Sequence, residues 1–365
     1  MPKPLTILAL TKYGRLGASA RLRTQQYLSF LEKEGIQVIV QTLLSDAMLA
    51  WRYQRGSYGT VALVKAYAQR CNILLQRRNF AIVWIEKEAL PWWPLWMEQI
   101  LLQGIPYVLD YDDAIFHNYD QHRNPWLRRL YGRRLDGLMA GAALVMAGNS
   151  YLAQRASDAG APWVEVVPTV IDLAHYPLPE KRRVVDALND KLPRIVWIGS
   201  PSTVRYLHLI REALQTVAKQ HPFVLRVIGG GDFKLPGVTI EVVPWSEETE
   251  TDNIGDCKLG IMPLLDSPWE RGKCGYKLIQ YMACSLPVVA SDVGVNRHIV
   301  TTGENGFLAT TTEDWIAALR RLLGDSLLSA GMGEAGRRRV EQRYSLQQTC
   351  PVIAGLLHTV AEKSS

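Results

Sequence analysis

The stretch "ERGKCGYKLIQYMACSLPVVASDVG" (Glu270 to Gly294) predicts a helix that begins among glycines, ends before Pro287 and leads into the strand-like run "VVAS". Within this predicted helix, side chains of one kind recur at the i, i+3, i+4 spacing that places them on one face. One stripe predicts the face that packs on the core: Tyr276, Ile279, Met282 and Ala283. The neighbouring stripe predicts a face that can reach a ligand: Lys273, Lys277, Gln280 and Tyr281. A helix followed by an apolar strand is the repeating unit of parallel α/β sheets.

The same alternation of strand-like and helical segments runs through the rest of the chain. The strand-like runs of the first half are "LTILAL", "IQVIVQ", "AIVWIE", "PYVLD" and "ALVMAG". Those of the second half are "RIVWIG", "FVLRVIGGG", "VTIEVVP", "KLGIMP" and "PVVAS", with a helix expected over about 203–220. The pattern predicts an α/β protein made of two Rossmann-like, doubly wound domains that face each other across a cleft.

The domain boundary is expected where the alternation stops. The segment "PTVIDLAHYPLPEKRRVVDALNDKLP" contains four prolines and a charged run, which is typical of a linker. We therefore predict a first domain over 1–168, a linker over 169–193 and a second domain over 194–340. The last segment, 341–365, is expected to be a helix that packs back toward the first domain.

Composition narrows the class of protein. With 365 residues, 48% of them hydrophobic and 21% charged, the chain can bury the cores of about two domains. Its N-terminus lacks a secretory apolar region, and its most apolar window, 89–109, is broken by prolines and polar residues. Five cysteines form no CxxC pair, so neither a disulfide framework nor a zinc site is expected. These features predict a cytoplasmic protein.

The positive charge of the chain is concentrated in its first half. Residues 1–168 carry 19 Lys and Arg against 13 Asp and Glu, and the formal charge of the whole chain is +6. Trp92, Trp93 and Trp96 lie close together in this half, and tryptophan favours the boundary between water and lipid headgroups. An anionic membrane surface is therefore a candidate partner. Two alternatives stay open: a solvated charged face, and a helix packed on the sheet through Trp93, Met97 and Ile100.

The second half offers two helix starts that favour an anion. The first is the glycine-flanked opening around Gly275, where Arg271, Lys273 and Lys277 can supply charge to phosphate oxygens. The alternative is that this pair of lysines lies at the surface and only covers apolar groups with its aliphatic chains. The second follows "RIVWIG": Gly199 and Ser200, a cap at Ser202 or Thr203, and Arg205. Gly230 lies in the loop "VIGGGDF", which lacks the dinucleotide-binding spacing and is interpreted as a tight loop that can face a nucleobase.

Carboxylates follow two strands of the first half. Asp110, Asp112 and Asp113 end "YVLDYDD", and Glu86 ends "AIVWIE". Such groups can act as bases, accept bonds from sugar hydroxyls or bind a metal, or they can simply cap turns. The loop "TKYGRLGASARLR" adds small residues that allow close approach of a ligand, among them Gly17, and leads into a helix with Arg21.

Several motifs resemble the retaining, nucleotide-sugar-dependent glycosyltransferases of the GT-B fold, family 4 (group 1). They are "RGKCGYKLIQYMACSLPVVASDVGVN", "GENGFLA", "EDW", "AGRRRVEQRYS", "GASARLR", "VLDYDDAIF" and "VPTVIDLAHY". The family's two glutamates fall on Gly272 and Gln280. The resemblance implies that Gln280 can still bond a ribose hydroxyl, and that Glu270 or the backbone around Cys274 and Gly275 replaces the other acid.

The resemblance also implies the roles of the remaining residues. Arg205, with Lys273 or Lys277, is expected on the diphosphate, and Asp112 or Asp113 replaces the family's histidine near the sugar. The donor site is expected to comprise Gly17, Gly199, Ser200, Gly230, Glu270, Arg271, Cys274, Gly275, Lys277, Gln280 and Tyr281. Arg21 and Glu86 are expected to contact the acceptor.

The implied activity is transfer of a sugar from a nucleotide-sugar to a glycan or lipid-linked acceptor with retention of configuration, in cell-envelope or exopolysaccharide synthesis. No cofactor, obligatory metal or nucleic-acid partner is expected. Two other interpretations stay open: a sugar-nucleotide epimerase or phosphorylase on the same fold, and a non-catalytic homologue that binds nucleotide-sugar. The protein is expected in the cytoplasm, and binding to an anionic membrane would place it at the inner membrane face.

Overall fold

The computed structural model describes residues 5–177 and 192–363. The chain forms two compact units, each of which is described by itself. Unit 1 comprises Met1–Thr169, Gly272–Cys274 and Thr349–Ser365, and unit 2 comprises Val170–Arg271 and Gly275–Gln348. Two segments distant in sequence thus complete the first unit. Of the predicted linker, residues 178–191 lie outside the described residues.

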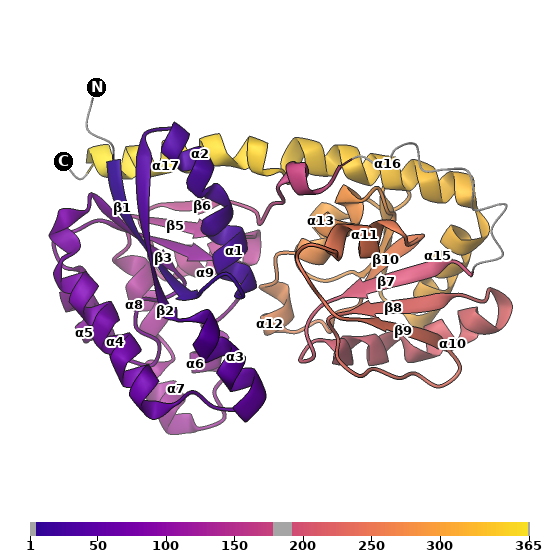
Figure 1. Ribbon diagram of the computed structural model, residues 1–365, viewed down its shortest axis with the longest axis horizontal. Coiled ribbons are helices and arrows are strands. Elements are labelled where there is room, and N and C mark those ends of the chain that lie inside the picture. The colour runs from indigo at the N-terminus through magenta and orange to yellow at the C-terminus, as the bar shows by residue number, and fades with distance from the viewer. Residues whose placement is uncertain (1–4, 178–191, 364–365) are drawn as a thin grey trace. The chain divides into compact units, whose positions relative to one another are not determined.

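Unit 1 is built on a parallel sheet of six strands in the order β2-β1-β3-β4-β5-β6 (Figure 1). Its strands are β1 (Leu5–Tyr13), β2 (Ile36–Leu44), β3 (Ile82–Glu86), β4 (Tyr107–Tyr111), β5 (Leu144–Ala147) and β6 (Val164–Val166). Every residue of β3, β4 and β5 is buried. This is why their sequences show apolar runs without alternation, as in strands covered on both faces.

The helices of unit 1 follow the strands in βα order, and α4 packs against β2 (Figure 1). The helices are α1 (Ala18–Arg23), η1 (Gln25–Tyr27), α2 (Leu28–Lys33), α3 (Asp46–Arg55), α4 (Thr60–Leu75), η2 (Arg77–Asn79), α5 (Leu95–Leu102), α6 (His117–Asp120), α7 (Pro125–Tyr131), α8 (Arg134–Ala140) and α9 (Ser150–Asp158).

Unit 2 repeats the architecture with the order β12-β11-β10-β7-β8-β9, again parallel throughout. Its strands are β7 (Arg194–Ile198), β8 (Val224–Ile228), β9 (Thr239–Val243), β10 (Leu259–Met262), β11 (Val288–Ser291) and β12 (Gly306–Ala309). Because all strands are parallel, their carboxyl ends lie at one edge, where such sheets bind ligands.

Helices connect the strands of unit 2 and lead out of it. They are η3 (Leu173–His175), η5 (Val204–Ile210), α10 (Arg211–Gln220), α11 (Glu250–Gly255), α12 (Pro268–Arg271), α13 (Tyr276–Ala283), α14 (Asn296–Ile299), α15 (Thr312–Gly324), α16 (Ser326–Arg343) and α17 (Leu346–Lys363). α13 lies between the sheet and α16. Gly333 and Gly336 on α16 form the contact: a Cβ on Gly333 would overlap the Ser285 carbonyl, and one on Gly336 would lie 2.9 Å from Met282.

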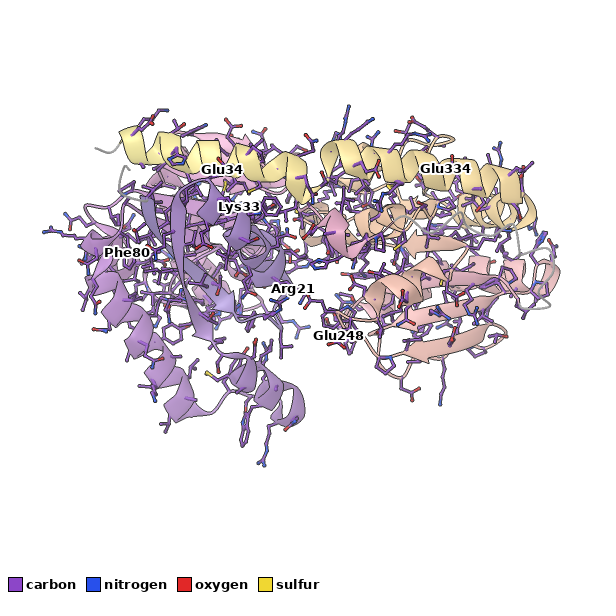
Figure 2. The ribbon with its side chains drawn as sticks, turned by 45° about the horizontal axis from the view of Figure 1, so that its top comes forward. Arg21, Lys33, Glu34, Phe80, Glu248 and Glu334 are labelled. Atoms are coloured by element: carbon purple, nitrogen blue, oxygen red, sulfur yellow. The ribbon has the colours of Figure 1, made fainter. Side chains whose placement is uncertain are left out.

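The end of α17 belongs to unit 1. His358 on this helix lies 3.4 Å from the carbonyl oxygen of Glu34, at the end of α2. Figure 2 shows Lys33 and Glu34 beside this helix. The side chain of Lys363 adds a cation–π contact with Trp163 at 4.3 Å.

The structure confirms the predicted class of two parallel α/β sheets. It adds two strands that the sequence analysis missed, β6 and β12. The helix expected over about 203–220 is two helices, the 3₁₀ helix η5 followed by α10. The predicted linker is not wholly a connector, because Ile171 forms a β-bridge with Ser345 and η3 follows it within unit 2.

Candidate functional site

A cation lies at the carboxyl end of β7 in unit 2. The Nζ atom of Lys277 is 4.2 Å from the ring centroid of Trp197, on β7. A Cβ at Gly199, just after this strand, would lie 2.5 Å from Trp197 Cη2 and 2.8 Å from Lys277 Nζ. Glycine is therefore required at 199, and the ammonium group is fixed beside exposed backbone. Gly199 and Lys277, both predicted for the donor site, lie next to each other.

The helix that carries Lys277 begins at a glycine in a left-handed conformation. Gly275 is the N-cap of α13, with φ of 66°. A Cβ there would overlap Ile299, so both backbone strain and packing exclude other residues. The positive end of the helix dipole favours negative charge at this point. Lys277 and the start of α13 thus combine two sources of positive potential.

The loop after β7 is ordered by its own hydroxyls. The backbone nitrogen of Ser200 donates to Thr203 Oγ1 at 3.1 Å, and Ser200 Oγ lies 2.9 Å from Ser202 Oγ. Thr203 is the N-cap of η5, but its side chain closes this loop and does not cap the helix. The exposed Arg205 follows, with its guanidinium 5.3 Å from the ring centroid of Tyr206. The next loop holds Gly230, where a Cβ would lie 2.5 Å from Val227.

The acidic and basic residues of α12 already have partners within unit 2. Glu270 is buried, and its carboxylate accepts hydrogen bonds from Tyr206 and Ser267. Arg271 forms an ion pair with Asp266 at 2.6 Å. A ligand would have to compete with Asp266 for Arg271. The structure therefore favours a positioning role for Glu270.

Two residues of the second stripe predicted on the 270–294 helix, Gln280 and Tyr281, are buried. Tyr281 is fully buried; its hydroxyl accepts from the nitrogen of Ile198 at 3.0 Å and donates to the carbonyl of Ile261 at 3.3 Å. Gln280 is 3% exposed. The prediction was wrong for these two side chains, because Tyr281 bonds the strands of the sheet and Gln280 bonds Glu250 on α11. Tyr281 therefore holds the sheet together.

Lys273 and Cys274 are also placed differently from the prediction, because both belong to unit 1. The carbonyl of Lys273 accepts from Asn149 Nδ2 at 3.0 Å, and its Nζ lies 3.4 Å from Asp113 Oδ1. The buried Cys274 thiol donates to the carbonyl of Asp112 at 3.1 Å. Lys273 is thus not a residue of α13, and its charge meets a carboxylate of "DYDD".

Asp112, expected near the sugar, forms a nearly buried ion pair. Lys87 Nζ lies 2.7 Å from Asp112 Oδ1 and donates to Ser19 Oγ at 2.8 Å. Burial alone would raise the pKa of Asp112, but Lys87 outweighs burial and the pKa is lowered. Lys87 has a φ of 66°, a costly conformation for a residue with a side chain. Asp110, next along β4, is likewise bound by Arg23 at 2.7 Å.

Glu86 ends β3 next to this ion pair. It is 3% exposed and accepts a hydrogen bond from the backbone nitrogen of Lys12 at 3.3 Å. Burial raises the pKa of Glu86 to about 7, although Lys87 opposes the shift. A carboxyl group that titrates near neutral pH can take up or release a proton during catalysis.

Gly17 and Arg21 lie at the start of α1, which follows β1 in unit 1. Gly17 is the N-cap, and a Cβ there would lie 2.5 Å from Tyr13 Cβ. Arg21 is partly exposed and donates to the carbonyl of Arg15 at 3.0 Å. In Figure 2 its side chain lies at the surface of the unit. The carboxyl ends of β1, β3 and β4 thus place Gly17, Glu86 and the "DYDD" segment at one edge of the sheet.

Sequence reasoning missed several residues of these clusters. In the sequence, Trp197 looked like an ordinary strand residue. Ser19 looked like one of several small residues in a loop. Glu250 on α11, which accepts from the amide of Gln280 at 2.6 Å, also gave no signal. Lys87 could have been found, because a lysine between two glutamates at a strand end needs an acidic partner when it is buried.

Neither a metal cluster nor a spanning helix is present within residues 5–177 and 192–363. No three His, Cys, Asp or Glu side chains of that part of the chain are grouped to hold a metal ion. No helix there is long and apolar enough to cross a membrane.

Comparison with known proteins finds a family match for most of the second unit. Residues 192–325 match the family model "Glycosyl transferases group 1". The O-antigen biosynthesis protein RfbC of Myxococcus xanthus is 33% identical over 91 residues, which are 25% of this chain and 7% of that protein. The chain spans less than half of the length of the curated relatives that it matches.

Solved structures match almost the whole chain. Sucrose-phosphate synthase from Thermosynechococcus elongatus superposes with a TM-score of 0.72 at 15% identity, covering 97% of this chain and 98% of that one. HepE from Anabaena, solved in complex with UDP-glucose, superposes with a TM-score of 0.69 at 16% identity, covering 97% and 99%. At this identity the likeness shows the GT-B fold. Within that fold, residues 192–325 are similar to the group 1 glycosyltransferases.

Proposed function

We propose that this protein transfers a sugar from a nucleotide-sugar to a glycan or lipid-linked acceptor, with retention of configuration, in cell-envelope or exopolysaccharide synthesis. The observation that carries the proposal is the family match over 192–325, which includes the β7 end and the start of α13. The O-antigen relative supports a surface polysaccharide as the product. The complex of HepE with UDP-glucose supports a uridine nucleotide as the first donor to test.

Unit 2 supplies the groups that a departing diphosphate needs. Cleavage of the sugar–phosphate bond leaves negative charge on the phosphate, and fixed positive charge lowers that barrier. Lys277 is held in place by Trp197, so its charge does not have to be ordered when the donor binds. The dipole of α13 acts in the same direction. Arg205 is exposed near the same loop and can fold over the phosphates.

Unit 1 supplies the groups assigned to the acceptor. Asp112 is neutralised by Lys87, so it orients its neighbours and is a poor base. Asp113 keeps 32% of its side chain exposed, and Glu86 has a pKa of about 7. We assign contact with the acceptor hydroxyl to Glu86 and Asp113, with Arg21 as a further contact. No metal or cofactor is assigned a role in this proposal.

The surface around α7 favours a lipid-linked acceptor. Trp126 is 76% exposed and Leu130 is 72% exposed, with the exposed Arg129 and Arg133 beside them. Residues 121–135 contain five arginines and no acidic residue. Exposed tryptophan combined with unbalanced positive charge is typical of surfaces that bind anionic membranes. We propose that the α7 surface (Trp126, Arg129, Leu130 and Arg133) docks on such a membrane.

Nearby side chains extend the α7 surface. Trp92 is 45% exposed, and its ring lies 6.1 Å from that of Tyr131 at the end of α7. Trp96 and Ile100 on α5 are also exposed. The alternative interpretation expected Trp93, Met97 and Ile100 to pack against the sheet. Trp93 does stack on Tyr67 at 5.6 Å, but Ile100 does not pack. The exposed tryptophans therefore support the membrane interpretation.

The test is a panel of nucleotide-sugars incubated with the full chain, with and without glycan and lipid-linked acceptors, while free nucleoside diphosphate is measured. Release that requires an acceptor supports the transferase. Conversion of the sugar without an acceptor would indicate an epimerase or phosphorylase. Binding without any turnover would indicate a non-catalytic homologue. The configuration of the product, read by proton NMR at the anomeric position, tests retention.

A further inference from the structure

Strand β2 forms one edge of the sheet in unit 1, and it is long for an edge strand. Its nine residues, Ile36–Leu44, pair with β1 on one side, and no strand in the described part of the chain pairs with the other side. The other edge strands of the two sheets are β6, β9 and β12, which have three to five residues. Natural proteins keep edge strands short or charged because an open edge can pair with another strand.

The composition of β2 also leaves its edge open. The strand "IQVIVQTLL" contains no charged residue and no proline, whereas β6 and β9 each contain a glutamate. Ile39, in the middle of β2, is 43% exposed, although isoleucine is one of the residues most often buried. β2 therefore lacks the short length, the charge and the proline that protect an edge.

The pairing with β1 decides which backbone groups of β2 face outward. The nitrogen of Leu5 donates to the carbonyl oxygen of Gly35 at 3.0 Å, so the odd-numbered residues of β2 bond to β1. The even-numbered residues turn their N–H and C=O groups away from β1. The carbonyl of Thr42 accepts from the side chain of Gln41, but no other residue between 5–177 and 192–363 bonds the outward groups of Val38 and Val40.

The middle of β2 is a palindrome, "QVIVQ", from Gln37 to Gln41. Two antiparallel copies of the strand, related by a two-fold axis at Ile39, place valine opposite valine and glutamine opposite glutamine. In this register Val38 lies opposite Val40 of the second copy, and both residues turn their backbone groups toward each other. The register that matches the side chains is therefore also the register that pairs the backbone.

We propose that β2 binds a second copy of this chain through an antiparallel pair with its two-fold axis at Ile39. Val38 and Val40 of each copy exchange backbone hydrogen bonds across the axis, and the two sheets become one. A two-fold interface needs a self-complementary surface, which the palindrome provides. A charge at the axis would meet its own copy and repel it, and β2 carries none. A strand of a different protein would not require a palindrome.

Sedimentation velocity of the full chain over a wide range of concentration tests the proposal. Wild-type protein should form a dimer that dissociates on dilution. Ile39→Lys places two like charges opposite each other and should raise the dissociation constant of the dimer by more than about tenfold. Val242→Lys is the matched control, because Val242 lies on the edge strand β9 and is 44% exposed; it should dimerise like wild type.

A mixture of two variants separates loss of pairing from loss of folding. Ile39→Lys and Ile39→Glu should each be monomeric alone. When they are mixed, opposite charges lie across the axis, and a dimer with one copy of each should form. A misfolded variant would not regain a dimer in this way.

Oxidation of single-cysteine variants tests the register. Residues directly opposite each other in a non-hydrogen-bonded antiparallel pair have Cα atoms about 4.5 Å apart, which a disulfide can bridge. Ile39→Cys should therefore form a disulfide-linked dimer. Gln37→Cys is the control and should not, because positions 37 of the two copies lie about 13 Å apart in this register. Wild-type protein gives the background from its own cysteines.

Each other result overturns the proposal. Wild-type protein that stays monomeric at all concentrations has no such interface. A dimer that survives Ile39→Lys is held together elsewhere. Mixed variants that stay monomeric, or Gln37→Cys that links as readily as Ile39→Cys, would show that the axis does not lie at Ile39. None of these measurements depends on sugar transfer.

Discussion

The ammonium group of Lys87 lies 2.7 Å from a carboxylate oxygen of Asp112, and the two side chains are 10% and 13% exposed. This pair decides which acidic groups of unit 1 are available to a ligand. Asp112 is already neutralised, and Asp110 is bound by Arg23 in the same way. Glu86 lies next to the pair and has no ion pair of its own among the described residues, and burial raises its pKa to about 7.

Glu86→Gln should become more stable relative to wild type as the pH rises. The pKa of Glu86 is raised from 4.5 to about 7 in the folded protein, so the folded state binds more protons than the unfolded state between these values. The stability of wild type is therefore fully present below about pH 4 and falls as the pH passes through about 7. Glutamine does not titrate.

Chemical denaturation of both proteins at pH 5 and pH 8 measures this difference. The gain of Glu86→Gln over wild type should grow by up to about 3 kcal/mol across the range. Glu212→Gln, an exposed change on α10, is the matched control and should show a constant difference. A constant difference for Glu86→Gln as well would contradict the prediction.

Lys277→Ala should weaken the binding of nucleoside diphosphate. The substitution removes a charge that is fixed beside Gly199, and a hydrogen bond to a charged group contributes about 1.5–3 kcal/mol, so affinity should fall about tenfold to a hundredfold. Calorimetry with UDP measures the effect. Lys219→Ala, on the exposed side of α10, should bind normally. Equal affinity of Lys277→Ala and wild type, with the fold intact, would remove Lys277 from the site.

Turnover should survive removal of divalent metal ions. Lys277, Arg205 and the start of α13 provide the positive charge that a metal would otherwise provide to the leaving group. The measurement is the rate of nucleoside diphosphate release before and after dialysis against EDTA. Loss of activity that Mn²⁺ or Mg²⁺ restores would contradict the prediction and would reassign Asp110 and Asp112 as candidate metal ligands.

The α7 surface should bind liposomes that contain anionic lipid, and more strongly at low salt than at high salt. Co-sedimentation with neutral and anionic vesicles measures binding. The double variant Trp126→Ser with Leu130→Ser should lose the apolar contribution, and Arg129→Gln with Arg133→Gln should lose the salt dependence. Leu327→Ser is the matched control, because Leu327 is 88% exposed in unit 2. Equal recovery of wild type in the supernatant under all conditions would refute docking.

The sheets could be predicted from the sequence because their central strands are buried on both faces. Continuous apolar runs such as "AIVWIE" have few other uses in a soluble domain. The two missed strands are edge strands: β6 is three residues long and partly exposed, and β12 is four residues long. Short edge strands carry little periodic signal, so the two sheets appeared to have five strands each.

The kinds of residue in the site could be predicted from the sequence, but the partners of each residue could not. Glycine near Lys277 and Arg205 predicted a cationic end of unit 2, and the structure places Lys277 at the carboxyl end of β7. The ion pair of Asp112 depends on Lys87 in another loop, and the buried Gln280 depends on Glu250, on a different helix of unit 2. Periodicity within one helix identifies its faces but does not reveal what covers them.

The contact of Gly333 with the Ser285 carbonyl has a consequence for natural variation. α13 carries Lys277 at its first turn, and the segment just after α13 packs on a buried glycine of α16. Even alanine at 333 would push the two helices apart and displace the lysine. Inactive alleles collected by random mutagenesis should therefore cluster at two places: around Lys277, and around Gly333 on α16.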